Sequence, residues 1–393
     1  MSTAGTVYPL GAAVAVAELE ADPAPLFARL RAEEPVSWLP ALDGWLVTQH
    51  DLALQVMREA ETFTVDDPRF STAQVVGPSM LSLDGAEHAR HRGPFARPFR
   101  LDAVRERFTD PVVRVVDRLL DAVEPLGAAE LRRALAGPLA VSAMVHALGL
   151  EATDPGDALA WYDAIVAEVT QITAGGPVDG RGGRAFGELC AAVEPALGRD
   201  PGSSLVAAAA HEAAGLSRAQ VVSNAAVLLF GGIETTEGMI ANAILHVLHE
   251  PEQRDLIAGD RSLVANAVEE SLRLEPAAAV VDRYATRDVA LGGASIARGE
   301  LVRVSLAGAN RDPAVFPEPD RFDVRRPNAQ RHLAFAQGPH VCLGMHLARL
   351  EAQTALARVL ERLPGLRLDP DRPSIVRGLV FRKPQTLHVL WEP

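Results

Sequence analysis

The segment at residues 335–349 is the strongest candidate for chemistry, because it places one thiol, Cys342, between Gly338 and Gly344. The residues after Cys342 keep a helical pattern through Arg362, so the cysteine lies at a helix start. The exposed N–H groups and positive dipole there favour a thiolate, the form that binds a soft metal. The two glycines would let the backbone approach a flat cofactor closely. A small buried hydrophobic cysteine is the alternative for this residue taken alone.

Zinc is a second alternative for this region. His332, His340, Cys342 and His346 are residues of the types that bind zinc. Their spacing matches no common zinc module, and the apolar residues around them suit a large flat ligand better. The region therefore favours a cofactor with a thiolate ligand over a zinc site.

The segment resembles the haem-binding signature of the cytochrome P450 family, in which a Phe, a Gly, a basic residue, the Cys and a further Gly recur at these spacings. The resemblance implies that Cys342 is the axial thiolate of a b-type haem. It also implies that Phe335 packs near the sulfur, that His340 contacts a haem propionate, and that Gly344 lies against the haem. Ala336 stands where the family more usually has Gly, and we expect only a small change in loop packing from it.

A long helix is predicted at about residues 217–250. It opens at Ser217 with Gln220 three residues on, which is a capping box, and it ends before Pro251. Gly231 and Gly232 at its centre cost about 1 kcal/mol each relative to Ala. A kink or a close helix crossing would explain these glycines without any ligand.

The family has Ala/Gly-Gly-x-acid-Thr at this place in its long helix, which gives the same segment a functional interpretation. The resemblance implies that Gly231 borders a groove with room for O₂. It also implies that Glu234 and Thr235 form an acid–alcohol pair that delivers protons when O₂ is activated. We therefore expect these two residues to be catalytic.

The resemblance also assigns roles to two further pairs of residues. Glu270 and Arg273 lie at i, i+3 on a predicted helix and would otherwise be an ordinary surface pair. The family has Glu-x-x-Arg at a similar distance before its cysteine, here 69 residues before Cys342, which implies a structural pair that holds the haem loop.

His88 and Arg92 lie one turn apart on another predicted helix, which alone would be a solvated basic face. The resemblance assigns both residues to haem propionates, together with Arg283 on a predicted strand. Cationic side chains make charge-assisted hydrogen bonds to such carboxylates.

Composition limits the classes of protein that remain. The chain has 393 residues, 48% of them hydrophobic, which is enough for a large core. Its net charge of −13 argues against general nucleic-acid binding. Two cysteines, Cys190 and Cys342, are too few for a secreted disulfide framework, so we expect a reducing, cytoplasmic location. The apolar run at residues 10–17 lacks a basic leader and is too short to span a bilayer, so we expect no signal peptide and no membrane anchor.

The elements that must position these residues are mostly helical. Patterns such as those at residues 110–123 and 134–148 predict a mainly α protein with a smaller β portion. A helix at 262–274 is followed by strand signals at 280–284, 288–291 and 301–305. Residues 311–327 have an irregular pattern, and 173–184 form a glycine-rich mobile loop. The resemblance implies the cytochrome P450 fold, with one haem-enclosing domain over residues 1–393.

The implied function is that of a haem-dependent monooxygenase, which inserts one oxygen atom from O₂ into a lipophilic small molecule by hydroxylation or epoxidation. Its expected pocket is chiefly apolar, which favours a terpenoid, steroid, fatty acyl or polyketide substrate. Alternatives are an atypical member that performs oxidative coupling or a rearrangement, and a haem carrier or sensor without turnover. The acid–alcohol pair, Glu234 and Thr235, weighs against both alternatives. The expected pocket residues are Val76, Phe230, Ala278, Val281 and Phe381.

Electrons are expected from a separate protein, because the sequence has no Gly-rich dinucleotide fingerprint. A ferredoxin with its reductase, or a flavodoxin, would supply them. Residues 88–107 contain six arginines against two acids, a local net charge of +4. We expect an acidic ferredoxin to dock there, beside Arg97 and Arg100, unless this is simply a solvated basic helix.

Overall fold

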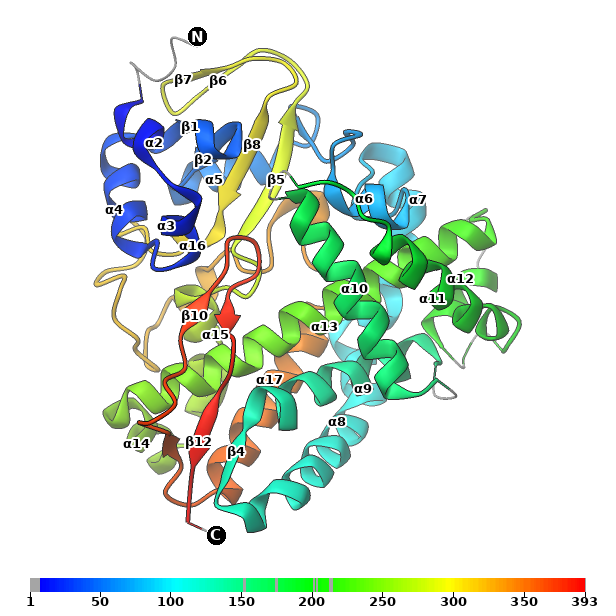
Figure 1. The fold of residues 1–393 in the computed structure, drawn as a ribbon, viewed down its shortest axis with the longest axis vertical. Helices are drawn as coiled ribbons and strands as arrows, with labels where there is room; N and C mark the ends of the chain where they lie inside the picture. The colour runs from blue at the N-terminus through cyan, green and yellow to red at the C-terminus, as the bar shows by residue number, and fades with distance from the viewer. Residues whose placement is uncertain are drawn as a thin grey trace.

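The longest helix, α13 Arg218–His249, runs diagonally through the centre of the molecule (Figure 1). Ser217 caps it by accepting a hydrogen bond from the Gln220 backbone, and the Gln220 side chain accepts one from the Ser217 backbone, so the predicted capping box is confirmed. At ~1.5 Å rise per residue, its 32 residues span about 48 Å. Most of its side chains are buried on all sides, as expected of a helix that crosses a core.

The computed structural model describes residues 8–150, 153–173, 176–200, 202, 204–211 and 215–392. Helices dominate these residues, as predicted. They are α2 Pro9–Ala13, α3 Val16–Glu20, α4 Ala24–Glu33, α5 His50–Arg58, α6 Ser71–Val76, α7 Gly85–Ala96, α8 Leu101–Val123, α9 Gly137–Leu148, α10 Pro155–Thr173, α11 Arg181–Leu197, α12 Leu205–His211, α13, α14 Pro251–Gly259, α15 Leu263–Leu274, α16 Leu306–Ala309 and α17 Met345–Arg362. The short 3-10 turns are η1 Pro40–Leu42, η2 Arg97–Phe99, η3 Glu124–Leu126, η5 Ala329–Arg331 and η6 Gly338–His340, and η4 Arg132–Ala136 is a short π-helix.

The strands form a smaller β portion in which segments distant in sequence pair. A five-stranded sheet has the order β1-β2-β8-β5-β3, with β2 and β8 parallel and the other pairs antiparallel. It lies beside the N-terminal helices in Figure 1. The bounds are β1 Val36–Leu39, β2 Gly44–Val47, β3 Phe63–Thr64, β4 Ala128–Glu130, β5 Val280–Ala285, β6 Val289–Leu291, β7 Ala294–Ile296, β8 Leu301–Ser305, β9 Arg367–Leu368, β10 Val376–Arg377, β11 Lys383–Pro384 and β12 His388–Leu390.

The main core surrounds α13. It combines apolar side chains of α8, α9, α10, α11, α15 and α17 with those of α13, whereas a second cluster lies under the five-stranded sheet. Helix α13 contacts α9 on one side and α17 on another, so it lies between the helix that follows Cys342 and the helices at the opposite side of the molecule. This arrangement places the Gly-Gly segment of α13 opposite the cysteine segment.

The structure differs from the sequence predictions in the bounds of some strands and of one loop. The strands predicted at 280–284, 288–291 and 301–305 are present as β5, β6 and β8, but β7 was missed, and it pairs with β6 around Gly292 and Gly293. The predicted loop at 173–184 is shorter, because α11 already begins at Arg181; residues 174–175 lie outside the described residues. Over the described part of the chain, no helix is both long enough and apolar enough to cross a membrane.

Candidate functional site

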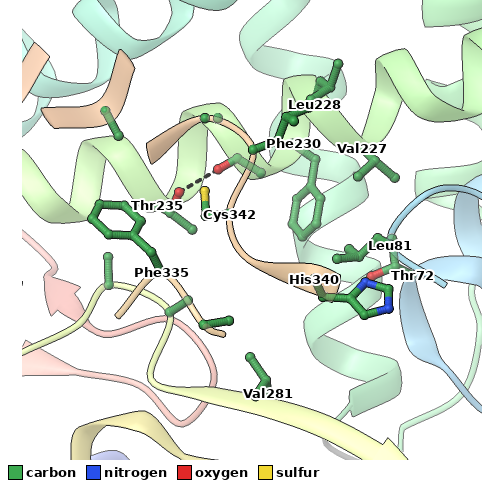
Figure 2. Close-up of a pocket in the computed structure, with 18 of the residues that line it drawn as sticks. Thr72, Leu81, Val227, Leu228, Phe230, Thr235, Val281, Phe335, His340 and Cys342 are labelled. Atoms are coloured by element: carbon green, nitrogen blue, oxygen red, sulfur yellow. Dashed lines mark hydrogen bonds between the residues drawn. The ribbon is translucent and has the colours of Figure 1, made fainter. Parts of the chain in front are cut away.

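A cavity of about 330 Å³ separates the centre of α13 from the cysteine segment. Figure 2 shows the sulfur of Cys342 and the side chain of Thr235 in the same pocket, with Phe335 on one side and His340 on the other. The structure therefore brings together residues from α13, the segment before α17 and strand β5, although Thr235 and Cys342, for example, lie 107 residues apart in the chain.

Cys342 lies three residues before α17, with its side chain open to the cavity and protein around its other sides. Its N–H donates to the Phe335 carbonyl at 2.8 Å. Burial raises the pKa of the thiol, while hydrogen bonds from the Gly344 and Met345 backbones and the charge of Arg92 lower it. The backbone N–H groups at the start of α17 therefore act on the thiol in the predicted direction, and burial opposes them. A bound metal cation would favour the deprotonated form.

The glycines around the cavity have different roles. A Cβ at Gly231 or Gly344 would meet open space on the cavity side, so both leave room beside a ligand. Gly338 does not serve this purpose, contrary to the expectation. It has a φ of +76°, and a Cβ there would lie 2.4 Å from the carbonyl oxygen of Met57 on α5. Ala336 has a φ of +55°, a left-handed conformation that glycine adopts at lower cost.

Two guanidiniums and an imidazole line one end of the cavity: those of Arg92, Arg283 and His340. Arg92 donates to the Val341 carbonyl at 2.6 Å, and Arg283 donates to the Asp282 carbonyl at 2.7 Å. Burial lowers the pKa of Arg283 to about 10, which leaves the guanidinium charged at neutral pH. No carboxylate among the described residues forms an ion pair with either arginine, so both can bind an anionic group.

The two histidines at this end lie together, with ring centroids 4.3 Å apart. His340 Nε2 is 2.8 Å from an Asp84 oxygen, and Asp84 also accepts from Thr64, which sequence reasoning missed. His88 is buried and does not itself line the cavity, yet its Nε2 has no hydrogen-bond partner. Burial lowers the pKa of His88 to about 4. An unpartnered buried nitrogen close to the Arg92 guanidinium is expected where a ligand supplies the missing hydrogen-bond partner.

These features fit a haem. The cavity offers an accessible sulfur, two backbone positions with open space beside them, and a cationic end for two propionates. Arg92, Arg283 and His340 would hold the propionates, with His88 behind His340. Residues of the predicted zinc set do not converge: within the described residues, no group of three or more potential ligands is placed to hold a metal ion, so the zinc alternative is wrong.

Thr235 and Glu234 are adjacent in sequence but point to different places. Thr235 lines the cavity, and its hydroxyl donates to the Gly231 carbonyl at 2.5 Å. Glu234 does not line it: this buried carboxylate contacts Tyr162 and Lys383 instead. Gly232 is explained by packing, because a Cβ there would lie 2.3 Å from the sulfur of Met144 on α9. A close helix crossing, the explanation that needs no ligand, therefore accounts for Gly232. It does not account for Gly231, where a Cβ would meet no neighbouring atom.

The predicted substrate residues Phe230, Ala278, Val281 and Phe381 all line the cavity, and the rings of Phe230 and Phe381 meet edge to face. Val76 does not line it, contrary to the expectation, because it is buried at the end of α6 with its side chain in the core. The cavity is also lined by residues that were not among the predicted substrate residues, including Thr72, Met80, Leu81, Val169, Thr173, Val227 and Leu228.

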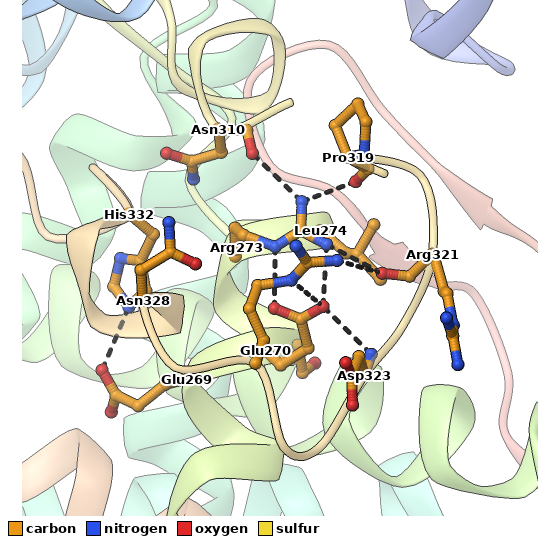
Figure 3. Close-up of polar contacts among 12 residues, drawn as sticks. Glu269, Glu270, Arg273, Leu274, Asn310, Pro319, Arg321, Asp323, Asn328 and His332 are labelled. Carbon is orange, nitrogen blue, oxygen red and sulfur yellow. Dashed lines mark hydrogen bonds and ion pairs between the residues drawn. The ribbon is translucent and has the colours of Figure 1, made fainter. Parts of the chain in front are cut away.

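Glu270 and Arg273 form a fully buried ion pair behind the cysteine segment (Figure 3). Arg273 donates to both Glu270 oxygens at 2.7 and 2.8 Å. It also donates to the carbonyls of Asn310, Pro319 and Arg321, all in or next to the irregular stretch that precedes Cys342. The pair thus connects α15 to that stretch by side-chain to backbone bonds.

Fewer arginines of residues 88–107 are free to meet a partner protein than the composition of this segment indicates. Arg90 pairs with Glu87, just outside the counted window, and Arg92 points to the cysteine segment. Arg97, Arg100 and Arg105 remain exposed. Turn η2, which contains Arg97, contacts α17, the helix that follows Cys342.

Comparison with known proteins agrees with this geometry. A family model described as Cytochrome P450 matches residues 202–386. The chain is 37% identical to the Nocardicin C N-oxygenase of Nocardia uniformis subsp. tsuyamanensis over 98% of both chains. It is 34% identical to the Vitamin D(3) 25-hydroxylase of Pseudonocardia autotrophica, over 93% of this chain and 94% of that one. A solved structure of the myxobacterial cytochrome P450 CYP267B1 with myristic acid superposes with a TM-score of 0.85 at 30% identity, covering 96% and 98% of the two chains.

Proposed function

The chain belongs to the cytochrome P450 family of haem-thiolate monooxygenases, and we propose that it inserts one oxygen atom from O₂ into a neutral, lipophilic secondary metabolite. The observation that carries the proposal is the sulfur of Cys342 opening into the same cavity as Thr235 and the apolar residues of α13. The bound haem would supply the iron at which O₂ is reduced and cleaved.

The charges around the cavity support a neutral substrate. Its charged lining residues are Arg92, Asp282, Arg283, His340 and Glu351. Arg92, Arg283 and His340 form the end that would hold the propionates, and Asp282 is paired with Arg303 at 2.6 Å. Glu351 belongs to α17, and burial raises its pKa well above the usual value, which favours the neutral carboxyl. The remaining lining near α13 and β5 is apolar or carries hydroxyls, which suits a hydroxylated lipophile better than an ion.

The test combines a spectrum with a ligand panel. Reduced protein with CO is expected to show the red-shifted Soret band of thiolate-ligated haem. A neutral steroid such as testosterone, or a macrolide, is expected to displace the water ligand and shift the Soret band toward the high-spin form, whereas a zwitterionic peptide is not. A product heavier by one oxygen atom would distinguish the proposal from oxidative coupling and from a carrier without turnover. Saturable shifts with the peptide alone would contradict the neutral substrate.

Thr235→Ala is expected to leave haem content and substrate affinity unchanged while product formed per electron falls several-fold. The hydroxyl is proposed to act only after O₂ has bound, by ordering proton delivery in the cavity. Without it, reduced oxygen escapes as hydrogen peroxide. The measurement is peroxide released per O₂ consumed, with Thr235→Ser as the control that keeps a hydroxyl. Equal peroxide yield in wild type and Thr235→Ala would contradict the role.

Reversing charge by Arg97→Glu with Arg100→Glu is expected to slow reduction by an acidic ferredoxin at least tenfold at low salt. Both side chains are exposed, Arg97 in turn η2, which contacts α17, and Arg100 directly after that turn. Long-range attraction would steer an acidic partner to them. Raising salt should slow the wild type in the same direction. The measurement is stopped-flow reduction with a surrogate ferredoxin, and Arg298→Glu on the β6–β7 side serves as the control. A reduction rate insensitive to both changes would exclude this surface.

A further inference from the structure

A single asparagine interrupts the apolar N-terminal half of α13. Asn224 is fully buried, and residues 221–229 around it are apolar apart from Ser223. A buried amide lowers stability unless its donors and its acceptor find partners. The presence of Asn224 in this part of the helix therefore indicates a specific set of hydrogen bonds.

The Asn224 side chain connects three elements of the fold. Its Oδ1 accepts from the Met80 backbone N–H at 2.7 Å, and its Nδ2 donates to the Gln220 carbonyl at 2.8 Å. The same Nδ2 lies 3.1 Å from Nδ1 of His91 on α7, whose ring is also buried. The two backbone partners fix the orientation of the amide, because an N–H group needs its oxygen and a carbonyl needs its nitrogen. Nδ1 of His91 therefore has to accept, as an unprotonated nitrogen.

Met80 belongs to a turn at residues 79–82, which we call the Met80 turn. Its two serines hold it together: the Ser79 N–H donates to Ser82 Oγ at 3.1 Å, and the Ser82 N–H donates to the Ser79 carbonyl at 3.1 Å. Within the part of the chain that the structure describes, the bond from Met80 to Asn224 is the only hydrogen bond between this turn and the rest of the protein. Asn224 is thus the polar anchor of the turn.

The Met80 turn forms part of the cavity wall. The side chains of Met80 and Leu81 line the cavity, and Figure 2 shows Leu81 in the same pocket as Val227 of α13. The distance between this turn and α13 therefore affects the space that a ligand can occupy. One buried hydrogen bond fixes the turn against the helix.

The helices at the other end of this connection are held by further contacts. Arg92, next to His91 on α7, donates to the Val341 carbonyl beside Cys342 at 2.6 Å. Gln220 is the capping-box residue of α13. A change at Asn224 or His91 is therefore expected to displace the Met80 turn rather than either helix.

The hydrogen-bond pattern is compatible with only one protonation state of His91. A protonated imidazole donates from both nitrogens, so Nδ1 could no longer accept from Asn224 Nδ2. If the amide turned its oxygen to the imidazolium, its NH₂ group would face the Met80 N–H, and the bond to the turn would be lost. Burial and the guanidinium of Arg90, whose Nη2 is 3.4 Å from His91 Nε2, lower the pKa of His91. The connection is therefore complete at neutral pH and is lost as the pH falls.

The charged and titratable groups around His91 agree with this direction. Glu87 would favour the imidazolium, but it is exposed and pairs with Arg90 at 2.7 Å. His88 stays neutral, because burial lowers its pKa to about 4. Among the described residues, the other such groups on α7, η2, α12 and the first turn of α13 are Asp84, which bonds to His340, and Arg92, Arg97, His211 and Arg218. Arginines predominate, and their charge opposes protonation of His91.

We propose that Asn224 and His91 are positioning residues for substrate recognition: while His91 Nδ1 is unprotonated, they fix the Met80 turn against α13 and so set how closely the cavity wall fits a compact lipophilic ligand. The proposal rests on the monooxygenase function above. Neither residue lines the cavity, so both act through the turn.

Asn224→Leu is the main test, because leucine keeps the approximate size of the side chain and removes the acceptor of the Met80 N–H. Exchange of backbone hydrogens with D₂O is followed by mass spectrometry on the holoenzyme. The peptide that contains the Met80 turn should exchange at least about tenfold faster in the variant than in the wild type. Gln74→Met is the control, since it removes an exposed amide of α6 that donates to the Arg69 carbonyl. Unchanged exchange of the Met80 turn in Asn224→Leu would overturn the proposal.

The pH dependence of this exchange distinguishes a connection through His91 from an ordinary packing contact. In the wild type, exchange of the Met80 turn relative to a reference peptide of α17 should quicken between about pH 7.5 and about pH 5, as His91 takes up a proton. His91→Asn should keep the ratio constant, because its amide oxygen can accept near the position of Nδ1 and does not titrate. A constant ratio in the wild type, or an equal rise in His91→Asn, would overturn the proposal.

Ligand affinity is the second readout. Testosterone, a neutral and compact probe, should shift the Soret band of Asn224→Leu with a dissociation constant at least about fivefold higher than in the wild type, as expected for the loss of one hydrogen bond. Imidazole binds the iron and is too small to depend on the turn, so its affinity should not change. Equal affinities for testosterone would overturn the role in recognition. Loss of the thiolate-type CO spectrum in the wild type would instead contradict the monooxygenase function.

Discussion

Replacing Cys342 with alanine is expected to abolish the thiolate-type CO spectrum and to reduce O₂-dependent product formation below detection. The reason is chemical: iron in this cavity needs a soft anionic ligand, and alanine offers none. The other cysteine, Cys190, lies on α11 and does not line the cavity. His340 cannot take over, because its Nε2 is bonded to Asp84 and its ring lies against His88.

The measurement has three parts: haem content, the spectrum of the reduced CO complex, and product yield with the best ligand of the panel. Haem content is expected to fall only in part, because Arg92 and Arg283 would still hold the propionates. Cys190→Ala is the matched control and should behave as wild type. Wild-type turnover by the alanine variant at Cys342 would overturn the haem-thiolate assignment itself.

The sequence was sufficient for features that depend on local spacing. The capping box at Ser217 defines the start of α13, and the helix before Pro276 forms as expected. The cysteine segment was recognisable because its residues are close together in the chain. In each case, one short stretch contains all the groups that determine the geometry.

Features that depend on distant partners could not be predicted in the same way. Tyr162, Glu234 and Lys383 meet although 221 residues separate the outer two, so nothing near Glu234 in sequence shows that its carboxylate turns from the cavity. Lys383 is the only lysine of the chain, and this was the one signal in the sequence that could have drawn attention to it. Val76 illustrates the opposite error: it lies close in sequence to residues that line the cavity, but the sequence does not fix which side of the short helix α6 faces the cavity.

The loss of unfolding free energy on removing a buried charge depends on whether the remaining charges keep a partner. The ion pairs of Glu270 with Arg273 and Arg326 allow this to be measured. Glu270 accepts from Arg273 and also from Arg326, whose Nε is 2.8 Å from Oε1, and from the Asp323 backbone. Burial lowers the pKa of Arg273, but not enough to discharge a guanidinium at neutral pH. One carboxylate therefore compensates two buried cations.

Glu270→Gln is accordingly expected to cost more than Arg273→Met. The glutamine leaves two buried guanidiniums without a carboxylate, and breaking a buried pair in this way costs about 3–5 kcal/mol. In Arg273→Met, the carboxylate keeps Arg326, so the loss is smaller, although three backbone carbonyls lose a donor. We expect the lower urea midpoint and the greater loss of haem in Glu270→Gln, because the stretch that both side chains hold leads directly into the cysteine segment.

Glu318→Gln provides the matched control for this comparison. Glu318 pairs with Arg321 at 3.4 Å with the same i, i+3 spacing, but both side chains are largely exposed. Removing that charge should change the free energy of unfolding by no more than about 0.5 kcal/mol. If Arg273→Met proved more destabilising than Glu270→Gln, the backbone hydrogen bonds of Arg273, rather than compensation of two buried cations, would be the principal contribution of this cluster to the fold.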